Sequence, residues 1–176
     1  MKQVVVIIGI VVVVFGIAVV LFIQDAKSRK LIVGNDAGST AQVGQEIPNQ
    51  GQEHIKDGTP HEPYNSNPPT SGPHYVQPAE WGVYPAPLVD EQAIHNLEHG
   101  GIWISYKDID EATVDLLKKI AKANGGSVIM SPRPNGEAKI ALASWTRLEK
   151  LEGYDEAKIL EFIKANKNKS PEPIAR

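Results

Sequence analysis

The fold is decided by residues 90–106, which carry the sequence DEQAIHNLEHGGIWISY. Two acidic residues open a helical pattern that continues through His99, and negative charge is favourable where a helix begins. The pair Gly100-Gly101 then ends the helix. The apolar run over 101–106 predicts a buried strand. A short helix that stops on glycine and passes directly into a strand indicates a domain of mixed α and β structure.

The segments that follow have regular patterns of their own. Residues 110–123 have acidic residues at the start, lysines at the end and apolar residues at helical spacing, which predicts an amphipathic helix. Residues 127–130 and 138–145 predict two strands joined by a turn around 134–136. The second of these strands is apolar on both faces, as expected for a central strand of a sheet.

A last helix completes the order of elements. It is predicted over 155–166, with Ile159, Leu160 and Ile163 facing the core. The order β-α-β-β-α predicts the fold class α+β, a small domain built on a mixed sheet.

The segment between residues 54 and 88 is expected to be irregular. It contains eight of the thirteen prolines, and Pro48 lies shortly before it. Helices and central strands do not tolerate this density of proline. The aromatic residues of the segment indicate that it packs on a core. We therefore expect a long, ordered, proline-rich loop, which in a compact domain is usually functional.

The N-terminal residues are expected to anchor the chain in a lipid bilayer. Residues 4–23 carry no charged side chain, and twenty helical residues at about 1.5 Å each span the roughly 30 Å hydrocarbon layer. The charged residues that follow directly favour an uncleaved anchor over a secretory signal peptide. The expected organisation is a flank at 1–3, a transmembrane helix at 4–23, a flexible spacer at 24–52, the α+β domain at 53–168 and a polar tail at 169–176.

The charges around this helix bear on its orientation. Lys2 precedes it, whereas Lys27, Arg29 and Lys30 follow it, and positive charge tends to stay in the cytoplasm. That rule alone puts the domain inside the cell. Long C-terminal domains nevertheless translocate despite unfavourable flanks, so the charge count does not decide the matter.

The composition excludes several partners and chemistries. A net charge of −3 and a pI near 6.0 leave no basic excess to bind the phosphate backbone of nucleic acid. The absence of cysteine excludes disulfides, thiolate catalysis and sulfur-ligated zinc or iron. A metal site must therefore use histidine, carboxylate or methionine. Met130 is a soft candidate ligand, but it lies in an apolar strand and is expected in the core.

All five histidines lie between residues 54 and 99, and the sharpest motif among them is H-x-x-E-H at 95–99. Neutral imidazole is the commonest metal ligand in proteins. On a helix, His95 and His99 stand one turn apart, with about 6 Å between their Cβ atoms, and can share an ion. On a strand they would stand about 13 Å apart and could not. The secondary structure of this motif therefore decides the hypothesis.

We predict a transition-metal site, for copper or zinc, because imidazole and carboxylate suit both ions. His95 and His99 are the first expected ligands. His54 and His74 are expected as further ligands, and Glu98 as a ligand or a partner of one. His74 ends a proline-rich run that restricts the backbone, which is useful where a side chain must point at a ligand.

Two alternatives stay open. H-x-x-E-H is also the signature of inverted zinc peptidases, in which the histidines bind zinc and the glutamate activates water. The chain would then be a metal-dependent hydrolase acting on a cell-envelope substrate. In the other alternative no metal is bound, the proline-rich loop is a structural or ligand-recognition surface for an unidentified protein or glycan, and the histidines brace it. His61 is expected to be structural.

Two stretches resemble signatures of a known family. They are Tyr64-Asn65 with PPTSGPH at 68–74, and HNLEHG at 95–100. They resemble an uncharacterised family, a domain of unknown function, of membrane-anchored bacterial and archaeal domains. The resemblance covers residues 54–162 and implies no activity. It implies an anchored domain that faces away from the cytoplasm, so we expect a single-pass protein of the cell membrane with an extracytoplasmic domain.

Overall fold

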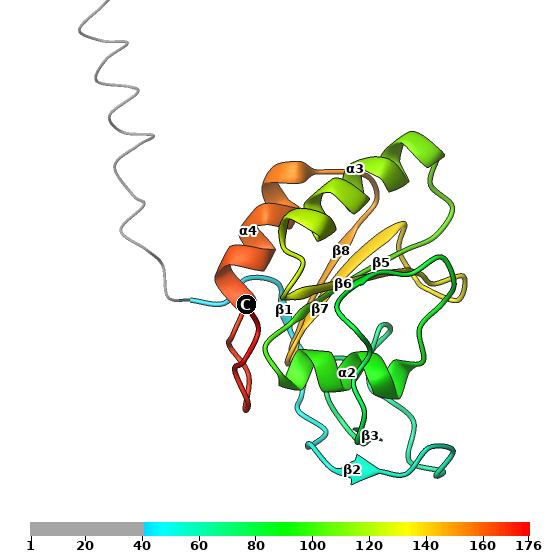
Figure 1. Ribbon diagram of the computed structural model, residues 1–176, viewed down its shortest axis with the longest axis vertical. Coiled ribbons are helices and arrows are strands. Elements are labelled where there is room, and N and C mark those ends of the chain that lie inside the picture. Colours follow the sequence, from blue (N-terminus) through cyan, green and yellow to red (C-terminus); the bar gives the residue numbers. More distant parts are fainter. Residues whose placement is uncertain (1–40) are drawn as a thin grey trace, which may run out of the picture. The chain divides into compact units, whose positions relative to one another are not determined.

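The computed structural model of the chain describes residues 41–176, which form an α+β domain with three helices and a mixed sheet (Figure 1). The expected fold class is thus confirmed for these residues. The strands are β1 (Gln45–Glu46), β2 (His54–Ile55), β3 (His74–Tyr75), β4 (Gly82–Val83), β5 (Ile102–Tyr106), β6 (Val128–Pro132), β7 (Ile140–Ser144) and β8 (Arg147–Leu151), and the helices are α2 (Asp90–Glu98), α3 (Glu111–Ala123) and α4 (Glu156–Asn166).

The main sheet has six strands in the order β1-β8-β7-β5-β6-β4. β6 pairs parallel with both β5 and β4. The pair β5-β6 is parallel because α3 returns the chain from the end of β5 to the start of β6. The pairs β5-β7, β7-β8 and β8-β1 are antiparallel. β7 is buried along its whole length between two neighbours, which confirms the expected central strand. β6 and β7 do not pair with each other, since β5 lies between them.

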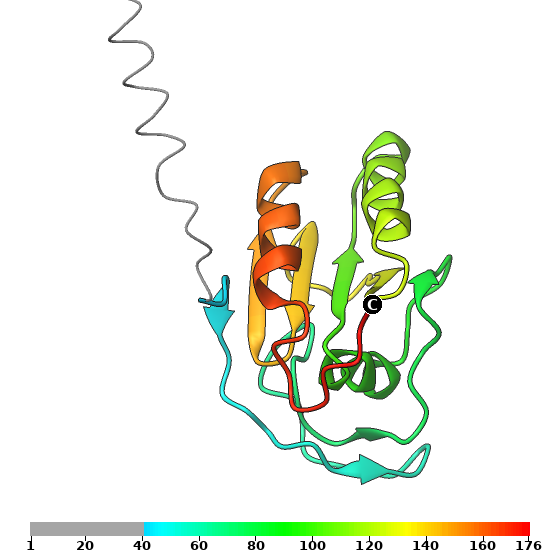
Figure 2. The same cartoon turned by 60° about the vertical axis from the view of Figure 1, so that its left-hand side comes forward.

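Alternate side chains of the strands supply two cores on opposite faces of this sheet. Figure 2 shows the helices that lie along these faces. In β5, Ile102 and Ile104 pack with α3 and α4, whereas Trp103 packs with α2. The domain therefore has three layers. Two helices cover one face of the sheet, and α2 with the proline-rich segment covers the other.

The last helix differs from expectation at one inward position. Ile159 and Ile163 are buried as predicted, but Leu160 is 43% exposed. Phe162 takes the place that Leu160 was expected to fill. Positions three and four residues after Ile159 share its face of the helix, whereas the next residue along does not.

The proline-rich segment is irregular and ordered, as expected. Its only regular elements in the described chain are the two-residue strands β2, β3 and β4. Residues 68–72 are buried against the sheet, and the carbonyl of Thr70 accepts a hydrogen bond from the N–H of Thr146 in the turn between β7 and β8. The segment is therefore a part of the domain's second core rather than a surface loop.

The start of α2 is fixed by an ion pair. The guanidinium of Arg133, at the end of β6, makes a bidentate contact with the carboxylate of Asp90. The same guanidinium lies 5.1 Å above the centre of the Trp103 ring. A partly buried fork of two hydrogen bonds fixes direction as well as distance, so it orients the helix on the sheet.

The end of α2 is fixed by the glycine pair. The N–H of Gly100 donates to the carbonyl of Leu97, and the N–H of Gly101 donates to that of Asn96, both at 2.9 Å. This is the Schellman pattern. Gly100 has a φ of 85°, a conformation that favours glycine. The predicted glycine stop is confirmed.

Both boundaries of the domain lie further out than expected. The spacer was expected to reach residue 52, but β1 pairs with β8 and Ile47 is buried. The tail at 169–176 was expected to lie outside the domain, but its backbone makes hydrogen bonds to the end of α2. Both segments attach mainly by backbone hydrogen bonds and carry few large apolar residues, so their composition resembles that of a linker.

No helix within residues 41–176 combines the length and the apolar character needed to cross a membrane. The transmembrane helix predicted at 4–23, the flank at 1–3 and most of the predicted spacer lie outside the described residues. The anchor stays a prediction from the sequence.

The close packing at the end of α2 gives a first prediction. A Cβ added at Gly101 would lie 2.5 Å from the Trp81 ring and 2.8 Å from the carbonyl oxygen of Asn96. We expect Gly101→Ala to lower the free energy of unfolding by about 1–3 kcal/mol, the usual cost of overpacking, as measured by urea denaturation.

Gly153→Ala is the matched control, because nothing lies within 4 Å of a Cβ placed at that glycine. It is expected to change the free energy of unfolding by less than about 0.5 kcal/mol. Equal losses in the two variants would contradict the packing described here.

Candidate metal centre

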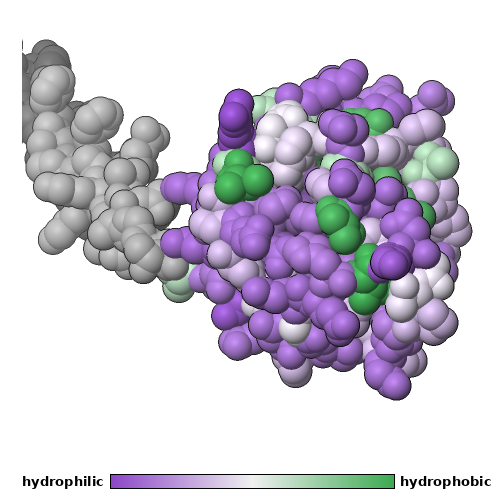
Figure 3. Space-filling model, turned by 60° about the horizontal axis from the view of Figure 1, so that its bottom comes forward, coloured by the Kyte–Doolittle hydropathy of each residue, from purple (hydrophilic) through white to green (hydrophobic). Residues whose placement is uncertain are grey.

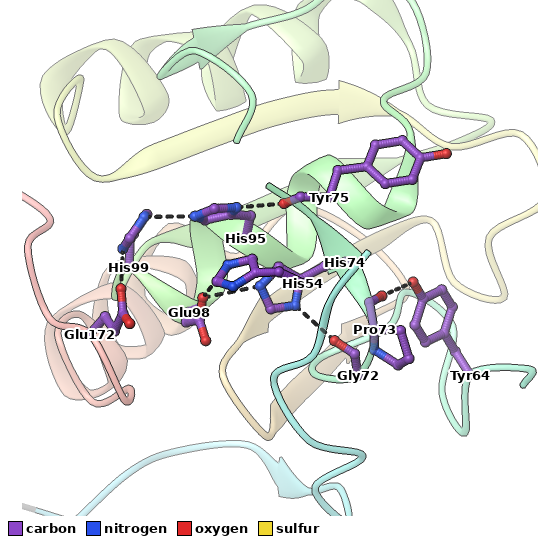
Figure 4. Close-up of polar contacts among 10 residues, drawn as sticks. All are labelled: His54, Tyr64, Gly72, Pro73, His74, Tyr75, His95, Glu98, His99 and Glu172. Atoms are coloured by element: carbon purple, nitrogen blue, oxygen red, sulfur yellow. Dashed lines mark hydrogen bonds and ion pairs between the residues drawn. The ribbon is translucent and has the colours of Figure 1, made fainter. Parts of the chain in front are cut away.

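Four of the five histidines meet where the small sheet β2-β3 lies against α2 (Figure 4). β2 and β3 run parallel and pair His54 with His74, so these two side chains lie at the same level. Helix α2 contributes His95, whose ring faces both of them. The three ring centroids are 4.6 to 5.1 Å apart. Residues far apart in the sequence are thus brought to one point.

One ligand atom from each of His54, His74 and His95 lies within 4.8 Å of the other two. Two nitrogen ligands that are each about 2.0–2.1 Å from a tetrahedral zinc ion stand about 3.3–3.4 Å apart. The triad must therefore contract by up to about 1.4 Å to reach that spacing. The three side chains are therefore close enough to hold a metal ion.

Backbone carbonyls orient two of the rings. His74 Nδ1 donates to the carbonyl of Gly72 at 2.8 Å, and His95 Nδ1 donates to that of Tyr75 at 2.6 Å. Because a carbonyl oxygen only accepts, each Nδ1 carries the proton, and the neutral ring has its lone pair on Nε2. Both Nε2 lone pairs point into the cluster. Histidines that bind metals ordinarily hold their second nitrogen in this way.

Glu98 supplies a buried carboxyl group to the cluster. Its Oε2 lies 3.0 Å from His74 Nε2 and 3.4 Å from His54 Nε2, and its side chain is only 1% exposed. Since the Nδ1 of His74 already donates to Gly72, a neutral His74 turns a lone pair toward this carboxylate. The 3.0 Å contact needs a proton between the two atoms, and a cation between the two groups would meet the same need. The site therefore favours positive charge.

His99 joins the cluster from the C-cap of α2. Its Nε2 lies 2.8 Å from His95 Nε2, which confirms that the two histidines have the helical spacing that a shared ion requires. Burial lowers the pKa of His95, nearby histidine charge lowers it further, and the bond to the Tyr75 carbonyl acts in the opposite direction. The lowered pKa favours the neutral form of His95, whose Nε2 lone pair accepts a hydrogen bond from His99 Nε2 in the structure.

The structure brings together all the residues that the sequence proposed for the site: His54, His74, His95, Glu98 and His99. Their assignment as ligands stays a prediction. His61 lies elsewhere, with its ring nitrogens on the Glu62 carbonyl and the Glu91 carboxylate, as a structural histidine would. Met130 is buried in the core that packs against α3 and α4, as expected.

The cluster is closed on one side and open on the other. His74 and His95 are buried, whereas the side chain of His54 is 40% exposed. Figure 3 shows the lower face of the domain in Figure 1, which includes β2 and the proline-rich segment, and this face is hydrophilic over most of its area. An ion in solution therefore has access to the cluster along His54.

Residues 54–176 match the model of a family described as a protein of unknown function, DUF3105. The chain belongs to the DUF3105 family. The match confirms the resemblance seen in the sequence and extends past residue 162 to the C-terminal segment. No match was found among curated proteins or among solved structures. The match thus begins at the first histidine of the cluster, and family membership assigns the chain no activity.

Asn96 is a site-supporting residue that our sequence analysis did not single out. Its buried amide makes two hydrogen bonds with one residue, since Oδ1 accepts from the N–H of Ala79 and Nδ2 donates to the carbonyl of Ala79, both at 2.9 Å. The pair ties the proline-rich segment to α2 beside His95. The signal that could have found it is its place within the HNLEHG signature.

Removing this amide is expected to destabilise the DUF3105 domain. Asn96→Ala leaves the N–H and the carbonyl of Ala79 buried without partners, so we expect the free energy of unfolding to fall by about 2–4 kcal/mol in urea denaturation. Gln92→Ala, on a partly exposed position of the same helix, is the control and is expected to cost less than about 0.5 kcal/mol. Similar values for both variants would show that the Ala79 contacts contribute little.

Proposed function

We propose that this protein is a membrane-anchored, extracytoplasmic module that binds a transition metal ion, copper or zinc, through its histidine cluster. The observation that supports the proposal is the shared orientation of the rings. Two backbone carbonyls occupy the outer nitrogens of His74 and His95, so that their Nε2 atoms converge with His54 on one point. A bound ion accepts these lone pairs and offsets the charge of Glu98.

The donor set favours zinc or cupric copper over cuprous copper. Imidazole nitrogen and carboxylate oxygen suit the divalent ions, whereas cuprous copper is favoured by thiolate and thioether sulfur. The chain has no cysteine, and Met130 packs in the core on the other face of the sheet. In this proposal His54, His74 and His95 are the primary ligands, and Glu98 and His99 complete the coordination shell.

A metal-dependent hydrolase acting on a cell-envelope substrate is the second candidate. The exposure of His54 favours it, because catalysis requires an open coordination position. The burial of Glu98 and its contacts with two histidines count against it, because a general base must reach a water on the open side. Two results together would favour this candidate: the protein shows metal-dependent turnover of a substrate, and Glu98→Gln abolishes that turnover but still binds the metal.

Calorimetric titration of the purified full-length protein with zinc and with cupric ions tests metal binding. We expect saturable binding of one ion per chain. Both His54→Ala and His95→Ala are expected to weaken it by more than the roughly 10–100-fold that loss of an outer-shell partner costs, because each removes a ligand. His54 is the sharper probe, since its exposed side chain contributes little to folding.

His61→Ala is the matched control, because it removes an imidazole outside the cluster, and it is expected to bind the ions as the unchanged protein does. Metal-free protein that shows no binding, with a melting temperature insensitive to chelators, would refute the proposal. That result would favour a structural or recognition module in which the histidines only brace the proline-rich segment.

The anchor and its orientation are proposed from the sequence. Residues 4–23 are apolar over a membrane-spanning length, and the family resemblance implies a domain outside the cytoplasm. The proposed metal binding does not depend on the anchor or its orientation. The orientation determines whether the site is exposed to metal ions inside or outside the cytoplasm.

The absence of cysteine allows a direct test of the orientation. A single cysteine introduced at the exposed position Glu152 is expected to react with a membrane-impermeant maleimide in intact cells. A cysteine in place of Lys2 is expected to react only after lysis. The reverse pattern would place the domain in the cytoplasm, as the charge count around the helix suggests.

A further inference from the structure

The C-terminal segment is bound to the end of α2, where two of the candidate site residues lie. The N–H of Glu172 donates to the carbonyl of Glu98 at 3.1 Å. The N–H groups of Ile174 and Ala175 donate to the carbonyl of His99 at 3.1 and 3.0 Å. The backbone of the site residues is thus hydrogen-bonded to a segment that follows the last helix.

This segment, residues 168–176, is called the C-terminal strap below. It fits closely against the glycine that ends α2, since a Cβ at Gly100 would lie 2.5 Å from Oδ1 of Asn168. The N–H of Asn168 donates to the carbonyl of Gly100 at 2.9 Å, and its side chain makes two hydrogen bonds with the backbone of Ala175. The strap is therefore held at both of its ends.

The strap places a carboxylate behind the ring of His99. Oε2 of Glu172 lies 3.6 Å from His99 Nδ1, as Figure 4 shows, and that nitrogen is buried without a hydrogen-bond partner among the described residues. The other nitrogen of the ring, Nε2, faces His95. The imidazole of His99 thus stands between the carboxylate and the cluster.

The position of the carboxylate behind His99 can be compared with the surroundings of the two buried histidines. His74 and His95 each have an oxygen acceptor behind Nδ1 and the cluster in front of Nε2. His99 has a carboxylate on the side where the other two rings have a carbonyl, at 3.6 Å from Nδ1 and thus beyond hydrogen-bond distance in the structure. When Nδ1 carries the proton and donates to Glu172, the Nε2 lone pair of His99 is free for an ion. In the structure, His99 Nε2 is instead the donor to His95 Nε2 at 2.8 Å, because the proton of His95 is on Nδ1, and this contact blocks two ligand atoms at once.

We infer that Glu172 is a positioning residue of the metal centre, which accepts the proton of His99 at Nδ1 when Nε2 of that ring binds an ion, and which makes the C-terminal strap a part of the site. The inference rests on the proposed metal binding. A carboxylate behind a ligating histidine also raises the basicity of the ring and strengthens its bond to the ion. Glu172 lies outside both signature stretches, so no motif in the sequence points to it.

A double-mutant cycle on the full-length protein tests this role. Glu172→Ala is expected to weaken zinc and cupric binding by roughly 10–100-fold, the usual effect of losing such a partner. His99→Ala is expected to weaken binding at least as much. In the His99→Ala background the Glu172→Ala change is expected to have no further effect, because the ring that it positions is gone.

Electron paramagnetic resonance of the cupric protein gives a second readout. Glu172→Ala and His99→Ala are expected to lose the same nitrogen coupling from the spectrum. Glu172→Gln, which keeps an acceptor oxygen, is expected to lose less affinity than Glu172→Ala. Glu161→Ala, which removes an exposed carboxylate from α4, is the control and is expected to bind as the unchanged protein does.

The outcomes separate this inference from the proposed function. If the unchanged protein binds no ion, both fail. If it binds, and Glu172→Ala binds equally well, only the role of Glu172 is overturned. An equal loss from Glu172→Ala in the presence and absence of His99 would also overturn it, because the strap would then act on the fold and not through that imidazole.

Discussion

Two backbone carbonyls, those of Gly72 and Tyr75, govern the chemistry of the histidine cluster. Each accepts a hydrogen bond from the Nδ1–H of one imidazole, so the other nitrogen of that ring faces inward. Both carbonyls belong to the short stretch around β3 that also supplies His74. One segment of backbone therefore sets the direction of two rings, and everything that holds this segment in place contributes to the site.

The two faces of the main sheet differ in the side chains that they bury. The face of the sheet under α3 and α4 is packed almost entirely with aliphatic and aromatic side chains. The face under α2 also buries the polar residues Thr70, Ser71, His74, His95, Asn96 and Glu98. Burial of polar groups is unfavourable unless they are paired, so such a face needs a strong core behind it. The apolar face provides that core.

The sequence was sufficient where structure follows from local periodicity. The amphipathic patterns located α2, α3 and α4, and the apolar runs located β5, β6 and β7. The H-x-x-E-H spacing identified the pair His95 and His99 because a helix fixes their separation. The convergence of His54 and His74 on them was expected from residue type and the family resemblance, and the pairing of β2 with β3 is what produces it.

What the sequence did not reveal depends on contacts between distant segments. Strand β8 carries Arg147, Glu149 and Lys150, which obscure the alternation of a half-buried strand. Strands of two residues are too short to show a period. The spatial order of β6 and β7 depends on the crossover through α3 and not on the turn that joins them. The C-terminal strap attaches mainly through backbone groups, which do not depend on residue type, so no side-chain pattern predicts its contact with α2.

The turn between β7 and β8 has a practical consequence. It places the indole of Trp145 edge-on to the imidazole of His74, with ring centroids 6.4 Å apart and planes at 83°. A paramagnetic ion on that imidazole would lie within quenching range of an excited indole. The domain thus contains an intrinsic fluorophore at the edge of its histidine cluster, and occupancy by cupric ions can be followed as a loss of emission without attaching a dye.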